Sequence, residues 1–255
     1  MEASENQLEG ELRVIKEGIL YVTPSKNAKL SKIYLSESKA SWITIEWLSE
    51  ELLVDATANY QALFDIHPPQ KGKIVMYNDD ECVSPRWHRS YLYQTKREPA
   101  SKTSYMYSGI EPFEDLSLPA PFQKFLNFLN EQEVEQQYNQ VIANWYANGL
   151  DYIAQHSDCQ KGMTENAPIA IITLCENEKL PRELKITPKS LGNLKNDSLY
   201  SQVRIMLQHG TIITMYGDTQ KKFRHGIPKA LNNLSSRVSL TFRKFPKNIK
   251  DDKGI

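Results

Sequence analysis

Apolar residues that recur every three or four positions predict two helices in this chain. The first lies between Trp47 and Phe64. Its apolar face consists of Leu48, Leu52, Ala56, Tyr60 and Leu63. Ser49 stands at the N-cap position, and His67-Pro68-Pro69 ends the segment because proline cannot continue a helix. A second, shorter helix is predicted after Pro121. Its apolar face consists of Phe122, Leu126 and Leu129.

Most of the other apolar runs are short and are typical of strands. They cover residues 73–77, 104–107, 139–146, 151–155, 168–174 and 211–216. Several end at turn residues such as Gly217-Asp218. Asn148-Gly149 separates two of the runs and is a strong hairpin signal, so it predicts that residues 139–146 pair with residues 151–155.

The segment from Arg237 to Arg243 predicts a strand with two different faces, because side chains alternate along a strand. Val238, Leu240 and Phe242 would point into a core. Arg237, Ser239, Thr241 and Arg243 would point the other way and line a cavity. The same alternation puts Asn144 and Tyr146 together on one face of their strand.

One or two helices followed by many strands favour a mainly β fold with flanking helices, of the α+β class. The expected architecture is a helix-backed double sheet of the jelly-roll type, a double-stranded β-helix. We expect one domain over residues 41–245. An N-terminal extension, residues 1–40, is expected to be partly mobile, and residues 246–255 are expected to form a mobile tail.

Composition narrows the class of protein only in part. The 31 Lys and Arg residues balance the 31 Asp and Glu residues, which removes the simplest argument for nucleic-acid binding, a strongly basic chain. Apolar runs are too short to span a bilayer, and the polar N-terminus is unlike a secretory signal. Three cysteines without CxxC spacing favour an intracellular setting, nuclear or cytoplasmic. We expect no membrane association and no obligate protein partner.

The triplet His156-Ser157-Asp158 is a candidate metal site. Two ligands separated by one residue at the end of a strand can bind one ion from adjacent directions, and His225 is the candidate third ligand. Two histidines and one carboxylate on one face of an iron ion leave positions open for oxygen and a bidentate cosubstrate. The triplet alone is weak evidence, since it also occurs in ordinary polar loops.

The two arginines of the polar-faced strand indicate an acidic ligand. Arg237 and Arg243 inside one cavity need anionic partners, because an unpaired buried charge is costly. A small dicarboxylate would supply them, and guanidinium groups suit carboxylates in particular. Asn144 and Tyr146 could donate hydrogen bonds to the same acid.

Taken in order along the chain, these motifs resemble the AlkB-like dioxygenases. They are Asn144-Trp145-Tyr146, His156-Ser157-Asp158, His225 within HGIPK, and the RxxxxxR pattern of 237–243. The resemblance covers roughly residues 40–245. Ser84-Pro85-Arg86 and Thr219-Gln220 are similar to landmarks of the branch that repairs alkylated nucleic acid.

The resemblance implies a role for each motif. His156, Asp158 and His225 would hold Fe(II). The residues that would bind 2-oxoglutarate are Asn144, Tyr146, Arg237 and Arg243, and O2 would be the second cosubstrate. Hydroxylation of an N-alkyl group on a base of DNA or RNA would then release formaldehyde and the free base.

Substrate recognition in this branch uses a lid, here about residues 80–110, and a base that is flipped out of its stack. Arg86 and Tyr91 would lie in the lid. Tyr107 would stack on the flipped base, and Tyr105 lies close by in the sequence; both tyrosines also fit ordinary packing in a strand. Gln160 would hydrogen-bond the edge of the base.

One departure from the family pattern leaves the substrate open. Repair members usually carry an acidic residue just after the aspartate of the HxD triplet, where Cys159 and Gln160 stand here. The missing charge weakens the case for 1-methyladenine or 3-methylcytosine. The alternative is the same oxygenase chemistry on a protein side chain, a lipid or an unusual nucleobase. A fold that has lost its chemistry is disfavoured, because all seven iron and cosubstrate positions hold competent residues.

Overall fold

The computed structural model describes residues 4–8, 11–26, 30–75, 81–92, 117–132, 137–189 and 197–246. The predicted strand at 104–107 therefore lies outside the described residues, as do Tyr105, Tyr107 and most of the predicted lid. None of the helices in the described ranges is both long and apolar enough to cross a membrane.

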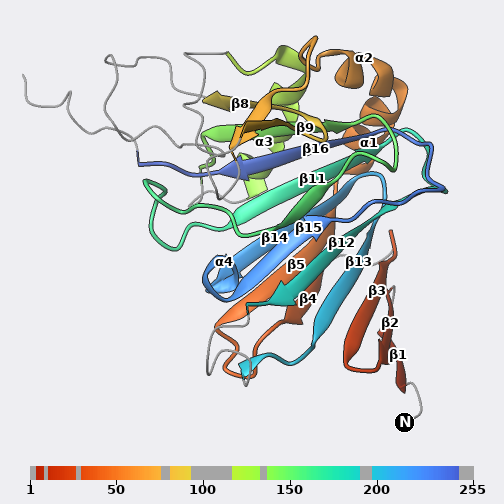
Figure 1. Cartoon of the computed structure of the whole chain (residues 1–255), viewed down its shortest axis with the longest axis vertical. Helices are drawn as coiled ribbons and strands as arrows, with labels where there is room; N and C mark the ends of the chain where they lie inside the picture. The colour runs from red at the N-terminus through yellow and green to blue at the C-terminus, as the bar shows by residue number, and fades with distance from the viewer. Residues whose placement is uncertain are drawn as a thin grey trace, which may run out of the picture.

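Two seven-stranded sheets form the body of the molecule (Figure 1). The major sheet has the order β4 (Ser31–Tyr34), β5 (Ser41–Trp47), β14 (Thr211–Gly217), β11 (Ile169–Cys175), β16 (Arg237–Arg243), β9 (Gln140–Tyr146) and β8 (Trp87–Leu92). The minor sheet has the order β1 (Ser4–Leu8), β2 (Glu11–Lys16), β3 (Ile19–Pro24), β13 (Gln202–Leu207), β12 (Arg182–Pro188), β15 (Phe223–Ile227) and β10 (Ile153–His156). A separate pair consists of β6 (Lys73–Val75) and β7 (Glu81–Val83).

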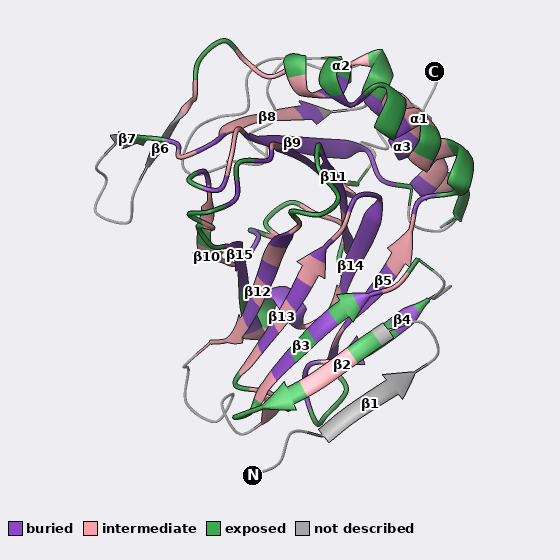
Figure 2. Ribbon diagram, turned by 90° about the vertical axis from the view of Figure 1, so that its right-hand side faces the viewer, coloured by how far each residue is buried: buried purple, intermediate pink, exposed green. Residues whose placement is uncertain are grey.

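The two sheets pack face to face around a shared core, which is the arrangement of a jelly roll. Ile43, Ile213 and Met215 of the major sheet are buried in one cluster with Ile186 and Ile205 of the minor sheet. Figure 2 shows the resulting alternation of buried and more exposed positions along β3, β12 and β13. The predicted mainly β fold with flanking helices is confirmed.

The segment before residue 41 contributes strands to both sheets, whereas the sequence prediction assigned it to an extension. β3 pairs in parallel with β13, and β4 pairs with β5 in the major sheet. The period-two pattern of β3 explains its place, because Leu20 and Val22 are buried while Tyr21 and Thr23 are exposed.

The predicted helices cover the outer face of the major sheet (Figure 2). They are α1 (Glu50–Ala58), α2 (Tyr60–Asp65) and α3 (Ala120–Gln132). A fourth, short helix that was not predicted is α4 (Thr219–Lys222). The Ser49 side chain accepts a hydrogen bond from the Leu52 N–H, so the predicted N-cap is confirmed. The single predicted helix is interrupted at Asn59, whose side-chain amide and backbone N–H both donate to the Asp55 carbonyl oxygen.

Helix α3 is held in place by its apolar face. Phe122, Leu126 and Leu129, predicted to share this face, are buried against Trp145 and Val238 of the major sheet. Burial of one such side chain stabilises the fold by about 1.5–3 kcal/mol. The helices therefore fix the outer side of the sheet whose inner side faces the cavity.

Strand β16 separates a core from a cavity, as its sequence predicts. Val238, Leu240 and Phe242 are fully buried in the cluster beneath the helices. The opposite face lines the cavity between the sheets and consists of Arg237, Ser239, Thr241 and Arg243. The two-faced strand predicted from alternation is thus confirmed.

The predicted hairpin around Asn148-Gly149 is wrong. β9 pairs with β8 and β16 in the major sheet, whereas β10 pairs with β15 in the minor sheet. The turn crosses from one sheet to the other and bonds to a distant loop: the Gly149 N–H donates to Asn233 and the Ala230 N–H donates to Gly149. A Cβ on Gly149 would lie 1.8 Å from the Ala230 carbonyl oxygen, so glycine is needed here for close approach rather than for a hairpin.

Replacement of Gly149 by alanine tests this close approach. We expect Gly149→Ala to lower the free energy of unfolding by roughly 1–3 kcal/mol, because two backbone segments must move apart. Denaturant unfolding measures the change. The control is Leu150→Ala, since the Leu150 side chain is 57% exposed and its loss should cost under about 0.5 kcal/mol. Equal stability of the two variants would contradict this interpretation of the turn.

Candidate active site

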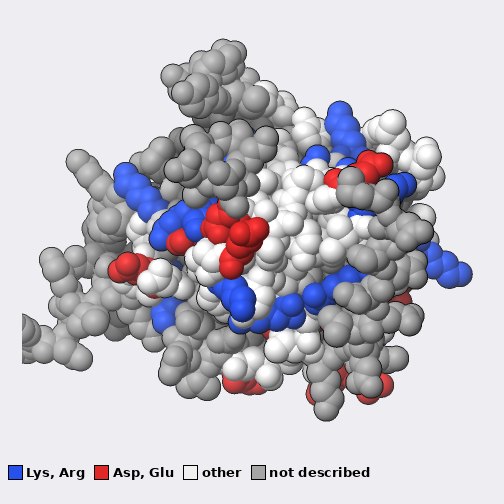
Figure 3. Space-filling view, turned by 90° about the horizontal axis from the view of Figure 1, so that it is seen from below, with Lys and Arg blue, Asp and Glu red and all other residues white. Residues whose placement is uncertain are grey.

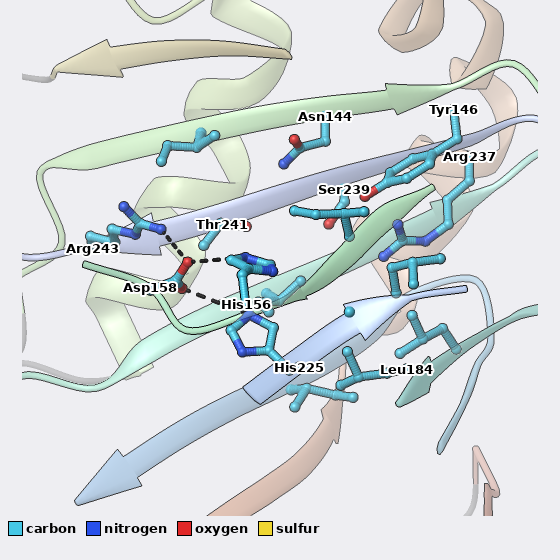
Figure 4. A pocket seen from close by; sticks show the side chains of 17 residues that line it. Asn144, Tyr146, His156, Asp158, Leu184, His225, Arg237, Ser239, Thr241 and Arg243 are labelled. Atoms are coloured by element: carbon cyan, nitrogen blue, oxygen red, sulfur yellow. Dashed lines mark ion pairs between the residues drawn. The ribbon is translucent and has the colours of Figure 1, made fainter. Parts of the chain in front are cut away.

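The seven predicted iron and cosubstrate residues line one cavity between the sheets (Figure 4). They come from four strands that lie far apart in the sequence, β9, β10, β15 and β16, and from the segment that follows β10. Apolar side chains such as Ile171, Leu184 and Ile213 line the rest of the cavity. The pairing of β9 with β16 places Asn144 opposite Ser239 and Tyr146 opposite Arg237.

A possible metal site lies at one end of this cavity. The ligand atoms of His156, Asp158 and His225 all lie within 4.8 Å of one another. His156 and His225 are direct partners in the pairing of β10 with β15, and Asp158 follows two residues after β10. The Nδ1–H of His156 donates to the Ala154 carbonyl oxygen at 2.9 Å, which leaves Nε2 toward the cluster. A backbone acceptor of this kind is what fixes the ring of a metal-binding histidine.

Charges around Asp158 favour metal binding. Burial alone would raise the pKa of Asp158, but Arg243, with Nη2 2.7 Å from Oδ1, and the two histidines hold that pKa well below its usual value. Burial lowers the pKa of His225 to about 3, and the neighbouring His156 acts in the same direction. At neutral pH the site therefore holds an ionised carboxylate and a neutral imidazole, the forms that bind a metal ion.

Gln220, which in the sequence is only part of the family-like Thr219-Gln220 motif, holds the loop that carries Asp158. Gln220, in α4, is buried, and its Oε1 accepts a hydrogen bond from the Asp158 backbone N–H at 2.8 Å. Its Nε2 lies 3.2 Å from the Met215 sulfur. Gln220 thus fixes the loop after β10. In the sequence it stands out only as a polar residue five positions before His225.

The other end of the cavity is lined by the buried guanidinium group of Arg237. Arg237 is 2% exposed, its Nη2 donates to Thr173 Oγ1 at 3.0 Å, and its guanidinium lies 4.9 Å from the centre of the Tyr146 ring. Among the described residues, Nε and Nη1 of Arg237 have no hydrogen-bond partner. A buried guanidinium without a partner is costly, so this end of the cavity fits a carboxylate.

The predicted substrate contacts are placed in different ways. Arg86 is buried, and its Nε donates to Asn144 Oδ1 at 2.8 Å, so its side chain contacts one of the predicted cosubstrate residues. Tyr91 is not brought to the cavity: it is 3% exposed and packs against Phe122 beneath the helices. Register explains this, because Tyr91 pairs with a core-facing position of β9. Gln160 is half-buried, and its backbone carbonyl oxygen accepts a hydrogen bond from the Met163 N–H.

The profile of the 2OG-Fe(II) oxygenase superfamily matches residues 41–243. The chain belongs to this superfamily. Its relatives belong to the AlkB group of oxygenases, so the predicted AlkB-like resemblance is confirmed.

Curated relatives in this superfamily carry AlkB names. The chain is 28% identical over 194 residues to "DNA oxidative demethylase ALKBH2" of Arabidopsis thaliana, which covers 70% of this chain and 59% of that protein. It is 29% identical over 234 residues to "Alpha-ketoglutarate-dependent dioxygenase alkB homolog 3" of Homo sapiens, which covers 91% and 73%. The match to the Mus musculus protein of the same name is 28% identical with the same coverage. The chain thus spans under two thirds of the plant relative's length.

Acid stability tests the burial of a histidine beside this site. His88 pairs opposite Asn144, and burial, followed by the positive charge of Arg86, lowers its pKa to about 4 from the ordinary 6.5. The unfolded chain takes up this proton first, so the free energy of unfolding falls as the pH drops from about 6.5 to 4. We expect His88→Gln to lose less stability than the unaltered protein over this window, measured by denaturant unfolding. The comparison isolates His88, because His209 and His225 titrate in both proteins. Identical pH profiles would contradict the prediction.

Proposed function

We propose that the protein demethylates N-alkylated bases in DNA or RNA by hydroxylation and formaldehyde release. In this proposal His156, Asp158 and His225 hold Fe(II). The residues that bind 2-oxoglutarate are Asn144, Tyr146, Arg237 and Arg243. The observation that carries the proposal is one cavity with two complementary ends: a cluster of two histidines and a carboxylate, and a buried Arg237 with unpartnered nitrogens.

Each end of the cavity has its own task. Arg237 would bind the distal carboxylate of 2-oxoglutarate, since Thr173 and the Tyr146 ring hold its guanidinium in one orientation. Arg243 is paired with Asp158, so in addition to its proposed contact with 2-oxoglutarate it would keep that carboxylate ionised and in place. Bound Fe(II), with 2-oxoglutarate and O2, supplies hydroxylation of a C–H bond coupled to decarboxylation of the cosubstrate. The hydroxylated N-alkyl group then breaks down to formaldehyde and the free base.

The proposal of a nucleic-acid substrate rests on the AlkB-like motifs and on the similarity to the ALKBH2 proteins, which are named DNA oxidative demethylases. The face in Figure 3 carries Lys, Arg, Asp and Glu side chains close together, in line with the formal net charge of zero. We therefore expect recognition to depend on an extruded base rather than on a broadly basic surface. Gln160 and, from the sequence alone, Tyr105 and Tyr107 stay proposed substrate contacts.

A second candidate function is the same oxygenase chemistry on another substrate, such as a protein side chain, a lipid or an unusual nucleobase. The observation in its favour is the pair that follows Asp158: Cys159 is exposed and Gln160 half-buried, and neither carries the negative charge that would meet a cationic methylated base. Negligible affinity for DNA and RNA at moderate salt would favour this alternative.

A demethylation assay tests the proposed function. Protein, Fe(II), 2-oxoglutarate and ascorbate are incubated with a panel of methylated DNA and RNA oligonucleotides, single- and double-stranded. We expect formaldehyde release and loss of the methyl group by mass spectrometry. His156→Ala should abolish turnover, and Lys221→Ala, on an exposed side chain, should leave it unchanged. Turnover of 2-oxoglutarate with no change in any oligonucleotide would refute the nucleic-acid substrate, and full activity of His156→Ala would refute the ligand assignment.

The contact from Gln220 to Asp158 gives a separate prediction for metal binding. Gln220→Leu removes the acceptor of the Asp158 backbone N–H, so the loop that carries this proposed ligand is less well fixed. Partners of metal ligands are typically worth about 10–100-fold in metal affinity, and we expect Mn(II), as a stand-in for Fe(II), to bind weaker by that factor. Titration of the metal-free protein measures it, with Lys221→Leu as the matched control. Unchanged Mn(II) affinity in Gln220→Leu would show that this hydrogen bond has no such role.

A further inference from the structure

A buried arginine outside the seven predicted residues contacts one of them directly. Arg86 is 3% exposed, and its Nε donates to Asn144 Oδ1 at 2.8 Å. It lies immediately before β8, where Trp87 pairs with Trp145 and His88 pairs with Asn144. From the sequence, Arg86 is expected in a lid that contacts the substrate. In the structure its side chain instead reaches the strand that carries the proposed cosubstrate residues.

This contact determines which way the Asn144 side chain is turned. An amide carries an acceptor oxygen on one side and a donor NH2 group on the other, whereas a guanidinium group can only donate. Arg86 therefore takes the oxygen and leaves the NH2 group as the donor of Asn144. Figure 4 shows the amide nitrogen of Asn144 on the side of the cavity and the oxygen turned away from it.

The orientation matters because the proposed ligand is an anion. An amide that presents its NH2 group stabilises a carboxylate, whereas the flipped amide presents its oxygen and repels it. Charge-assisted hydrogen bonds are roughly twice as strong as neutral ones, so the bond from Arg86 strongly disfavours the flipped form. Burial strengthens this selection, since a buried guanidinium without its acceptor would be costly.

We propose that Arg86 is a positioning residue for the cosubstrate: it orients the Asn144 amide so that its NH2 group faces 2-oxoglutarate. The inference rests on the proposed role of Asn144 in binding 2-oxoglutarate. If Arg86 has this role, its replacement weakens 2-oxoglutarate binding even when no nucleic acid is present.

Binding of 2-oxoglutarate to the Mn(II)-loaded protein, without O2 or oligonucleotide, tests the proposal by calorimetric titration. We expect Arg86→Met to raise the Kd for 2-oxoglutarate by about tenfold or more, as loss of a charge-assisted contact does. Asn144→Ala should raise it too, and adding Arg86→Met to Asn144→Ala should raise it no further, since the two residues act through one contact. The control is Arg89→Met, which lies opposite Ala143 on the core-facing side of β8 and should leave the Kd unchanged.

A second variant separates orientation from charge. Arg86→Lys keeps the positive charge but replaces the planar guanidinium by a flexible point charge. A positioning role predicts weaker 2-oxoglutarate binding in this variant, whereas a role through charge alone predicts full affinity and would overturn the proposal. Thermal unfolding of each variant confirms that it is folded before titration.

The outcomes distinguish this inference from the proposed function. If Asn144→Ala leaves the Kd unchanged, the proposed cosubstrate role of Asn144 is itself wrong. If Asn144→Ala weakens binding but Arg86→Met does not, or if Arg86→Met weakens it equally with and without the Asn144 side chain, the positioning role is refuted and the proposed function stands.

Discussion

The ion pair between Asp158 and Arg243 is the interaction on which the site depends. Asp158 follows β10, an edge strand of the minor sheet, and Arg243 ends β16, an interior strand of the major sheet, so the pair joins the two sheets beside His156 and His225. Both side chains are almost fully buried. Loss of one partner would leave an uncompensated buried charge, which costs roughly 3–5 kcal/mol. The pair therefore determines where the carboxylate lies, and the histidines are arranged around it.

The two arginines of β16 line the cavity in two different settings. Arg243 pairs with the Asp158 carboxylate, whereas the partner of Arg237 is the neutral hydroxyl of Thr173 and its Nε and Nη1 have no hydrogen-bond partner among the described residues. A dicarboxylate with one end at a metal ion and the other at Arg237 would satisfy both ends. Both arginines face the cavity because they lie six positions apart in the strand, and an even separation keeps two side chains on one face. The apolar face of the same strand ties the site to the helices through Leu240 and Phe242.

Alternation along single strands made much of the site predictable from the sequence. It placed Asn144 with Tyr146 and Arg237 with Arg243 correctly, because every second residue shares a face. The error at Asn148-Gly149 arose because its partner, the loop around Asn233, lies more than eighty residues away, and a local turn signal carries no such information. An Asn-Gly pair can form a hairpin turn or a turn that crosses between two sheets, and the local sequence does not distinguish the two.

Other residues could not be placed without three-dimensional contacts. Tyr91 was expected at the substrate, but its face is set by the register of β8 on β9, which leaves no mark in the sequence. Arg86 was expected in a lid that contacts the substrate, but its side chain donates a hydrogen bond to Asn144 of β9. Gln220 was noticed only as a landmark, because a single buried hydrogen bond to a backbone N–H has no sequence pattern.

The most direct test of the central claim is a crystal structure of the protein with Mn(II) and 2-oxoglutarate in the absence of O2. We expect His156, Asp158 and His225 to bind the metal ion. We also expect the distal carboxylate of 2-oxoglutarate to accept hydrogen bonds from Nε and Nη1 of Arg237, which have no partner among the described residues. A metal ion bound elsewhere, or a cosubstrate that leaves Arg237 without a carboxylate, would contradict it.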